Sequence, residues 1–369
     1  MRDVVGARVI GCGLFALGIS GMALGGACAP KKGALMLSIN TDMKAPKDVN
    51  AVSITILVND AVKHSFIGRV SPQGSVELPA TLAIAEPLDP AAAVRIRIMA
   101  FQELQPRVLR DVRTTIPRAG RVALLRIPLD FVNDGSAKGS PLPPGSLERG
   151  GGDVDFHASF QPPCSDILKE TVIDGECKDS FVDSAALPDL VDGLIGNSKG
   201  GSCFDVARCF ANATPVGQGG EGAPDAGVGP DAGVGPTSLD TGTCSLPLKD
   251  TAPAGLNFAL VTPGTGECIR PGECYIPLDR GPAGWKESGG IVQFPPSVCK
   301  LLTTRKLRLF QSSSCASKGE SNSICAASSA DSGVDASPAD SGEDAEGGGR
   351  AIPGNGGKRF PRDAGGDGP

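Results

Sequence analysis

The sequence predicts a mainly β, multidomain protein: an antiparallel β-sandwich of immunoglobulin-like or transthyretin-like build, then small disulfide-stapled units and a disordered tail. Three observations predict it. Residues 34–131 alternate apolar and polar side chains with period two and contain no Cys. Ten Cys follow later in the chain, a density typical of small crosslinked units. The chain has 51 Gly and 31 Pro but only 4% aromatic residues, which argues against one large core.

Residues 1–27 are interpreted as a signal peptide, because Arg2 and Arg8 precede an apolar, Gly-rich run that ends near Leu24. The run is shorter than the roughly 20 residues of a membrane-spanning helix, so we expect cleavage. Within it, VIGCGLFA matches the dinucleotide-binding pattern, but the strand, helix and acidic residue that the motif requires do not follow. We therefore expect no nucleotide cofactor.

Cys28 follows this segment and is the predicted lipid attachment site. A bacterial lipoprotein signal places an aliphatic residue three positions before the modified Cys; here Gly25 holds that place and Leu24 precedes it. The alternative is ordinary cleavage after Ala27, which leaves Cys28 as an unmodified N-terminus. Ala29 is not the Asp that retains many lipoproteins at the inner membrane. We expect an outer-membrane lipoprotein of the cell envelope, with a secreted or periplasmic soluble protein as the alternative.

Ten of the other Cys form an even set that can pair completely in an exported protein, which leaves Cys28 as the odd thiol. Their gaps are wider than those of typical zinc ligand pairs, so we expect disulfides and no metal. Spacing does not fix the connectivity, but it suggests local bridges. The suggested pairs are Cys164 with Cys177, Cys203 with Cys209, Cys244 with Cys299, Cys268 with Cys274, and Cys315 with Cys325.

The predicted sandwich contains seven alternating runs, from ALMLSI to RVALLRIPL. In AVRIRIMAF, Val94, Ile96 and Ile98 share one face, and Arg95 and Arg97 share the other, which predicts a strand with one wet side. The domain lacks the inter-sheet disulfide and the buried Trp of antibody domains, so only the architecture is predicted.

Composition divides the rest of the chain. Residues 132–163 are predicted to be a linker and 164–213 a small Cys-rich unit. A Pro/Gly/Asp spacer at 214–243 carries two copies of PDAGVG, whose Asp residues lack the alternate spacing of a calcium loop. Residues 244–325 are predicted to be a disulfide-stapled β-domain, and 326–369 a disordered tail.

Catalytic motifs are scarce. His64 and His157 are the two His residues, and each is interpreted as a surface residue. GNSKG around Ser198 matches the nucleophile elbow, but both His precede it and neither a strand nor a helix frames it. The net charge of −6 is mild and no basic face is evident, so nucleic acid is not expected as a partner. We predict no catalytic residues, no cofactor and no enzymatic activity.

Tyr275 and Trp285 are the only Tyr and Trp. They could stack on a sugar, as in carbohydrate-binding β-modules, or pack in the core of a small domain.

Four segments, KGALMLSINTDMKAPKDVNAVSITILV, LPATLAI, CFDVARCF and CYIPLDRGPAGW with the following FPPSVC, carry a family resemblance. The chain resembles a group of uncharacterised predicted lipoproteins of myxobacteria from about Lys32 to Cys325. The resemblance implies a β-rich first part and Cys-containing segments joined by spacers, and no established activity. Val172 stands where relatives carry another Cys, which puts the pairing scheme of that segment in doubt.

These observations predict a non-enzymatic, lipid-anchored cell-envelope protein with a binding or structural role. The membrane is its partner through the lipid anchor, and envelope proteins or glycans are further candidates. One alternative is a carbohydrate-binding or adhesion module. The other is a secreted hydrolase with an unrecognised site, which a well-formed acidic cleft would support.

Overall fold

The computed structural model describes residues 33–325 with gaps at 72–73, 86–90, 151–153, 192–202, 219–237, 249–252, 254 and 282–283. The predicted signal peptide, Cys28, Ser198, most of the spacer and the predicted tail lie outside the described residues. The described part is mainly β, as predicted, and belongs to one compact unit. None of its helices is long and apolar enough to cross a membrane.

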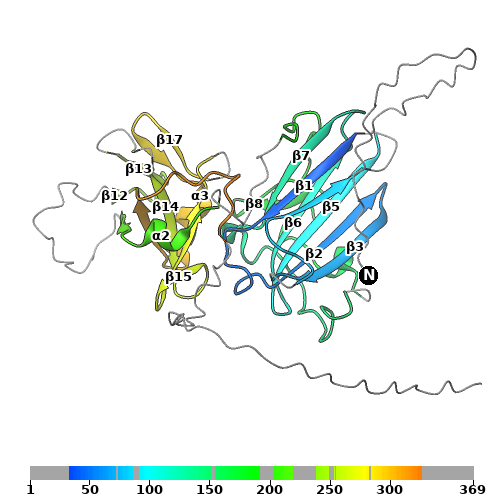
Figure 1. The fold of residues 1–369 in the computed structure, drawn as a ribbon, viewed down its shortest axis with the longest axis horizontal. Helices are drawn as coiled ribbons and strands as arrows, with labels where there is room; N and C mark the ends of the chain where they lie inside the picture. Colours follow the sequence, from blue (N-terminus) through cyan, green and yellow to red (C-terminus); the bar gives the residue numbers. More distant parts are fainter. Residues whose placement is uncertain are drawn as a thin grey trace, which may run out of the picture. The chain divides into compact units, whose positions relative to one another are not determined.

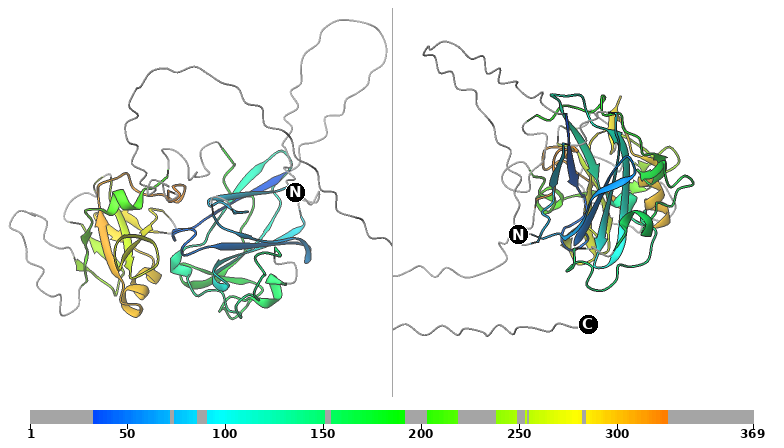
Figure 2. Two further views of the ribbon diagram at one scale, coloured as in Figure 1. Left: turned by 60° about the horizontal axis from the view of Figure 1, so that its bottom comes forward. Right: turned by 90° about the vertical axis from the view of Figure 1, so that its right-hand side faces the viewer.

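Each of the seven alternating runs contains a strand, and the strands form two sheets (Figures 1 and 2). Apolar side chains of both sheets fill the space between them; Leu37, Ile39, Ile96, Ile98 and Ile127 are fully buried. One sheet has the order β3 (Ala61–Arg69), β2 (Ala51–Val58), β5 (Ala93–Gln102) and β6 (Gln105–Thr115); the other has the order β4 (Ala80–Ile84), β1 (Ala34–Asn40) and β7 (Val122–Pro128).

This strand order separates the two predicted builds. In the immunoglobulin arrangement the first strand shares a sheet with the second and fifth. Here β1 pairs with β4 and β7, while β2 and β5 lie in the opposite sheet, which leaves the transthyretin-like build. All pairings in the sandwich are antiparallel except that of β1 with β7. Because these two strands are parallel, their C-terminal ends lie at the same edge of the sheet.

Described residues of the segment predicted as a linker, 132–163, instead pack on the outer face of the four-stranded sheet. Phe156 and Phe160, in and after the short helix α1 (Phe156–Ser159), contact Phe101 edge to face. Arg97, predicted to be wet, is 2% exposed. The prediction of one wet side was wrong, because Phe156 and Phe160 of this later segment cover that face of the sheet.

Arg97 has its polar atoms satisfied in this interior. It donates from Nε to Asp111 Oδ1 over 2.7 Å and from Nη2 to Asp111 Oδ2 over 2.6 Å. Its Nη1 donates to the carbonyl oxygens of His157 and Phe160. A bidentate pair with further backbone acceptors is the arrangement that makes a buried guanidinium tolerable.

The described residues of the predicted Cys-rich unit, 164–213, pack in two different places. Its hairpin of β8 (Glu170–Ile173) and β9 (Glu176–Asp179) contacts β6, where the Asp111 N–H donates to Thr171 Oγ1 over 3.0 Å. Its helix α2 (Val206–Phe210) packs on the C-terminal sheet through Phe210, which stacks on Tyr275.

The C-terminal part is an antiparallel five-stranded sheet with smaller elements around it (Figure 1). The five strands are β10 (Thr214–Pro215), β19 (Arg308–Ser312), β14 (Asn257–Thr262), β16 (Glu273–Leu278) and β15 (Glu267–Arg270). The smaller elements are a three-stranded sheet of β13 (Ser245–Pro247), β18 (Ile291–Gln293) and β17 (Lys286–Ser288), the pair β11 (Gly217–Gln218) and β12 (Ser238–Leu239), and helix α3 (Pro296–Thr304). The 3-10 helix η1 (Phe131–Asn133), which follows β7 of the sandwich, contacts α3.

All ten candidate Cys form disulfides. The bonds Cys164–Cys177, Cys244–Cys299 and Cys268–Cys274 match the suggested pairs. The other two suggested pairs were wrong, because the bonds are Cys203–Cys325 and Cys209–Cys315, with sequence separations of 122 and 106.

The packing of the chain explains why Cys203 and Cys209 bond to Cys325 and Cys315 and not to each other. Phe204 forms a parallel bridge with Ile324, which brings the neighbouring Cys203 beside Cys325. Helix α2 lies against β19, whose end leads to Cys315. Local spacing could not reveal these bonds, because they depend on where α2 packs.

Candidate functional site

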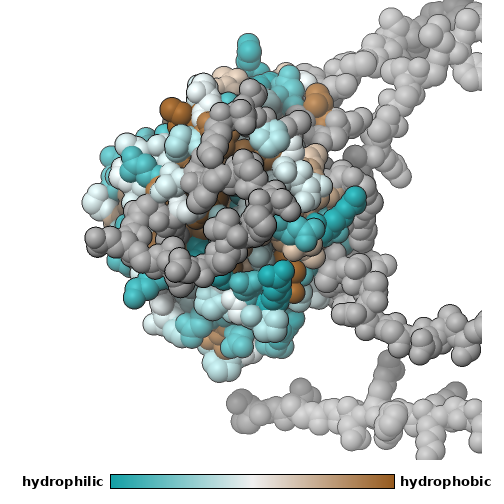
Figure 3. All heavy atoms as spheres, turned by 90° about the vertical axis from the view of Figure 1, so that its left-hand side faces the viewer, coloured by the Kyte–Doolittle hydropathy of each residue, from teal (hydrophilic) through white to brown (hydrophobic). Residues whose placement is uncertain are grey.

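On the coloured part of the face in Figure 3, hydrophobic residues are scattered among hydrophilic ones. A cavity of about 290 Å³ lies where the ends of β1 and β7 meet β16 and α3. One connected hydrophobic core, which includes Ile39, Ile127, Phe258 and Trp285, supports both sides of it. The cavity is lined by Asn40, Asp42, Arg110, Arg126, Pro128, Asp130, Val132, Asn133, Ile173, Asp174, Pro277, Leu278, Asp279, Gly284, Trp285, Pro295, Val298 and Glu320.

Asp42 and Asp130 reach the cavity through the parallel pairing of β1 and β7. Asn40 and Pro128 are register partners. Asp42 lies two residues after Asn40, and Asp130 lies two residues after Pro128. The Leu129 N–H donates to the Asn40 carbonyl over 2.9 Å, which continues the pairing past the strand ends. Two carboxyl groups from distant parts of the sequence therefore meet at one edge of the sheet.

Asp42 is 7% exposed, and its Oδ1 accepts a hydrogen bond of 2.7 Å from the Phe131 N–H. Burial raises the pKa of Asp42 to about 7; the Phe131 hydrogen bond and Lys318 act against this rise, and Asp279 adds to it. Burial and the neighbouring charges of Asp42 and Asp279 raise the pKa of Asp130 well above its ordinary value. The cavity thus holds two carboxyl groups that resist ionisation.

Lys318 is a buried cation whose charge acts on both Asp42 and Asp130. Its side chain is 4% exposed and its Nζ forms an ion pair with Asp279 Oδ1. Burial opposes the charge of Lys318, but Asp279, Asp42 and Asp130 together raise its pKa above the ordinary value. Lys318 is therefore charged and is largely committed to Asp279.

Arg110 stands on the sandwich side of the cavity and donates from Nη1 to the Val172 carbonyl over 3.0 Å. Burial lowers the pKa of Arg110 to about 10, while Asp130 and Asp174 oppose the change. It remains a cation at neutral pH.

Five carboxyl groups and two guanidinium groups line the cavity, and Lys318 adds one positive charge, so two negative charges are in excess when every group is ionised.

Two buried polar atoms of cavity-lining residues have no protein partner among the described residues: Trp285 Nε1 and Asn40 Oδ1. Trp285 is fully buried, packs edge to face on Phe258 at 5.1 Å between ring centroids, and has the Arg280 guanidinium 5.3 Å from its ring centroid. A buried donor or acceptor without a partner costs free energy and is uncommon. Both atoms are fully buried, so neither is exposed to the space of the cavity.

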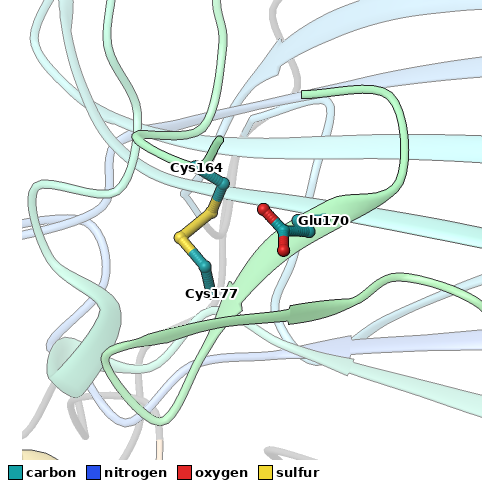
Figure 4. A group of neighbouring side chains, drawn as sticks. All are labelled: Cys164, Glu170 and Cys177. Carbon is teal, nitrogen blue, oxygen red and sulfur yellow. A yellow bond between two sulfur atoms is a disulfide. The ribbon is translucent and has the colours of Figure 1, made fainter. Parts of the chain in front are cut away.

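The described residues contain one group of three potential metal ligands within 4.8 Å of one another: Cys164, Glu170 and Cys177. Figure 4 shows that the two sulfur atoms are bonded to each other, so neither can act as a thiolate ligand. Glu170 Oε2 instead accepts hydrogen bonds from Ser165 Oγ and the Asp166 N–H, both over 3.0 Å. The cavity carboxylates do not form such a close group.

The two aromatic residues singled out in the sequence lie apart. Tyr275 is 3% exposed and packs between Phe210 and Phe310, in a different cluster from Trp285. The structure therefore does not bring them together as an exposed stacking surface. Trp285 alone is at the cavity.

Sequence reasoning missed Asp42, Asp130, Asp279 and Lys318. Each Asp follows a predicted strand, in SINTD, IPLD and CYIPLD, which is a weak signal that a turn would also explain. The information that was lacking is the parallel pairing of β1 with β7, which depends on the completed fold.

Comparisons with protein-family models, with curated proteins and with solved structures found no match to this chain, so the assignment of the cavity rests on its geometry and chemistry.

Proposed function

We propose that the protein is a non-enzymatic, lipid-anchored protein of the cell envelope, held in the outer membrane through Cys28, and that it binds a small molecule in the acidic cavity. The observation that supports binding most strongly is the cavity itself, which five carboxyl groups line. Five disulfides are typical of proteins that fold outside the cytoplasm. The membrane anchor and the binding site are separate parts of the proposal.

The anchor is tested by the intact mass of the full chain isolated from membranes of its own host, beside a Cys28→Ser variant. We expect an N-terminal Cys28 that carries acyl chains in the wild type, and loss of both the added mass and the membrane association in the variant. A soluble wild-type protein without added mass at Cys28 would contradict the anchor while leaving the cavity unaffected.

A second candidate, a hydrolase, is favoured by the pair of carboxyl groups. A carboxyl group with a pKa near 7, such as Asp42, can donate a proton at neutral pH, which is the role of the general acid in glycoside hydrolysis. Hydrolysis of glycan or peptide substrates that is lost in both Asp42→Asn and Asp130→Asn would support this candidate. Binding without turnover supports the non-enzymatic proposal.

The adhesion alternative places glycan binding on Tyr275 and Trp285. Because both are buried and lie in separate clusters, a glycan would have to reach Trp285 through the cavity. Retention of the wild type on immobilised glycans, together with its loss in Asp130→Asn, would locate such binding in the cavity.

A further inference from the structure

We infer that the Cys268–Cys274 disulfide is a thiol-exchange site, where a low-molecular-weight thiol becomes covalently attached to Cys268 and Lys47 stabilises negative charge on sulfur. The bond joins β15 to the start of β16, and neither Cys nor Lys47 lines the acidic cavity. The inference is therefore independent of the cavity and of the anchor.

Exposure narrows the choice among the five disulfides. All ten bonded Cys lie in the described part of the chain, and two of them, Cys177 and Cys268, are exposed. Exchange begins with the attack of a thiolate on a disulfide sulfur, so it depends on access to that sulfur. Two bonds meet this condition, Cys164–Cys177 and Cys268–Cys274.

The charge beside the sulfur separates these two bonds. Lys47 Nζ donates to Cys268 Sγ over 3.2 Å. At the other bond, a carboxylate oxygen of Glu170 lies within 4.8 Å of both sulfur atoms (Figure 4). A cation stabilises the thiolate that attacks or leaves, whereas an anion repels it. Exchange is therefore favoured at Cys268–Cys274.

Contacts between the sandwich and the C-terminal sheet hold Lys47 at this place. Its Nζ also donates to the Gly264 carbonyl and lies 3.5 Å from Asp48 Oδ1. Asp48 Oδ2 accepts hydrogen bonds from the Gly266 N–H over 2.7 Å and from the Lys44 N–H over 3.0 Å. Lys47 is thus fixed beside the sulfur, while backbone donors stabilise the carboxylate next to it.

The other acidic groups of the hairpin have cationic partners. Glu267 forms an ion pair with Lys44, and Glu273 forms ion pairs with Arg270 and Arg308. Helix α2, which also contacts β15, carries Arg208 as its charged residue. The groups around Cys268 therefore leave the positive charge of Lys47 effective at the sulfur.

The fold depends less on this bond than on the long-range ones. Cys268 and Cys274 are register partners in the β15–β16 hairpin, and β16 also pairs with β14. A disulfide stabilises less when the loop that it closes is short. This bond has a sequence separation of 6, against 122 for Cys203–Cys325. The hydrogen bonds of the sheet therefore hold the hairpin when the bond is open.

The exchange consists of two balanced steps. A thiolate RS⁻ attacks Cys268 Sγ, the RS–Sγ bond forms, the bond to Cys274 breaks, and Cys274 leaves as a thiolate that takes a proton from solvent. A second RS⁻ attacks the sulfur of the attached thiol, RSSR leaves, and Cys268 is released as a thiolate beside Lys47. Two thiols are oxidised and the Cys pair is reduced.

Reduced glutathione tests the site, with the full-length mature chain and its disulfides intact at pH 7.5. The reaction is stopped with acid at intervals, and the proteolytic fragments are identified by mass. We expect glutathione to attach first to Cys268, and roughly tenfold more slowly to Cys164 or Cys177, because the charges beside the two bonds are opposite. Circular dichroism should show that the chain with the adduct remains folded.

Variants assign the role of the charge. Lys47→Gln should slow attachment at Cys268 roughly two- to fivefold, the effect of one exposed ion pair, and Lys47→Arg should restore most of the rate. Lys63→Gln removes an exposed charge on β3 and is the matched control, which should react as the wild type does. Glu170→Gln should speed attachment at the Cys164–Cys177 bond.

A pH profile separates this role from a structural one. Once the Cys268–Cys274 bond is reduced, the rate of alkylation of Cys268 by iodoacetamide follows its thiolate form. The profile should move to higher pH in Lys47→Gln and stay in place in Lys63→Gln. Glutathione attached first to another Cys, no adduct at Cys268, or a wild-type rate and profile in Lys47→Gln would overturn the inference.

Discussion

The raised pKa of Asp42 predicts how the stability of the protein depends on pH. The group titrates at its ordinary value of 3.8 in the unfolded chain and at about 7 in the folded chain. Between these values the folded state holds a proton that the unfolded state has lost, so the free energy of unfolding falls as pH rises. The contribution of Asp42 is fully present below pH 4 and is lost as pH rises through 7.

The size of the effect follows from the two titration points. A shift from 3.8 to about 7 corresponds to on the order of 4 kcal/mol at full loss. Asp42→Asn removes the titration and keeps an oxygen that can accept the Phe131 N–H. At pH 8 the variant should therefore gain up to about 4 kcal/mol of stability over the wild type, relative to their difference at pH 4.

Urea unfolding at pH 4, 5.5 and 8, with the disulfides intact, measures this difference. Asp60→Asn is the matched control, because it removes an exposed carboxyl group that is not part of the cavity lining, and it should parallel the wild type. If the wild type and Asp42→Asn differ by the same amount at all three pH values, the burial and charge argument for the cavity is refuted.

Three further predictions concern the core and the disulfides. Trp285→Ala should lower the free energy of unfolding by roughly 3–5 kcal/mol, because the residue is fully buried; thermal unfolding measures it, and an unchanged transition would contradict the core role. Arg97→Met should cost roughly 3–5 kcal/mol, since the buried Asp111 loses its two close hydrogen bonds and keeps only the longer contact of 3.7 Å to Arg95, and denaturant unfolding that matches the wild type would refute that pairing. Mass spectrometry of proteolytic fragments should find Cys203 linked to Cys325, and a fragment that links Cys203 to Cys209 would contradict the packing of α2.

The sandwich could be predicted because its information is local. Alternation in runs such as AVRIRIMAF reports which side chains face the core, and Val94, Ile96 and Ile98 are buried as expected. The opposite face could not be read in the same way. Arg97 is polar by sequence, yet it lies in the interior because a later segment supplies both apolar cover and hydrogen-bond acceptors.

The cavity could not be predicted because it is assembled from distant segments. Asp42 and Asp130 approach each other through a parallel pairing, and Asp279 and Lys318 join them from the C-terminal part. Three disulfides between near neighbours were within reach of spacing arguments. The bond of Cys209 to Cys315 was not, because it depends on where α2 packs.

The measurement that tests the account of the cavity most directly is the NMR titration of the Asp42 side-chain carboxyl carbon in the folded protein. Burial raises the pKa of Asp42 from its ordinary value of 3.8 to about 7. The account therefore predicts a titration midpoint near pH 7 for this carbon and no such titration in Asp42→Asn. A midpoint near pH 4 would contradict it.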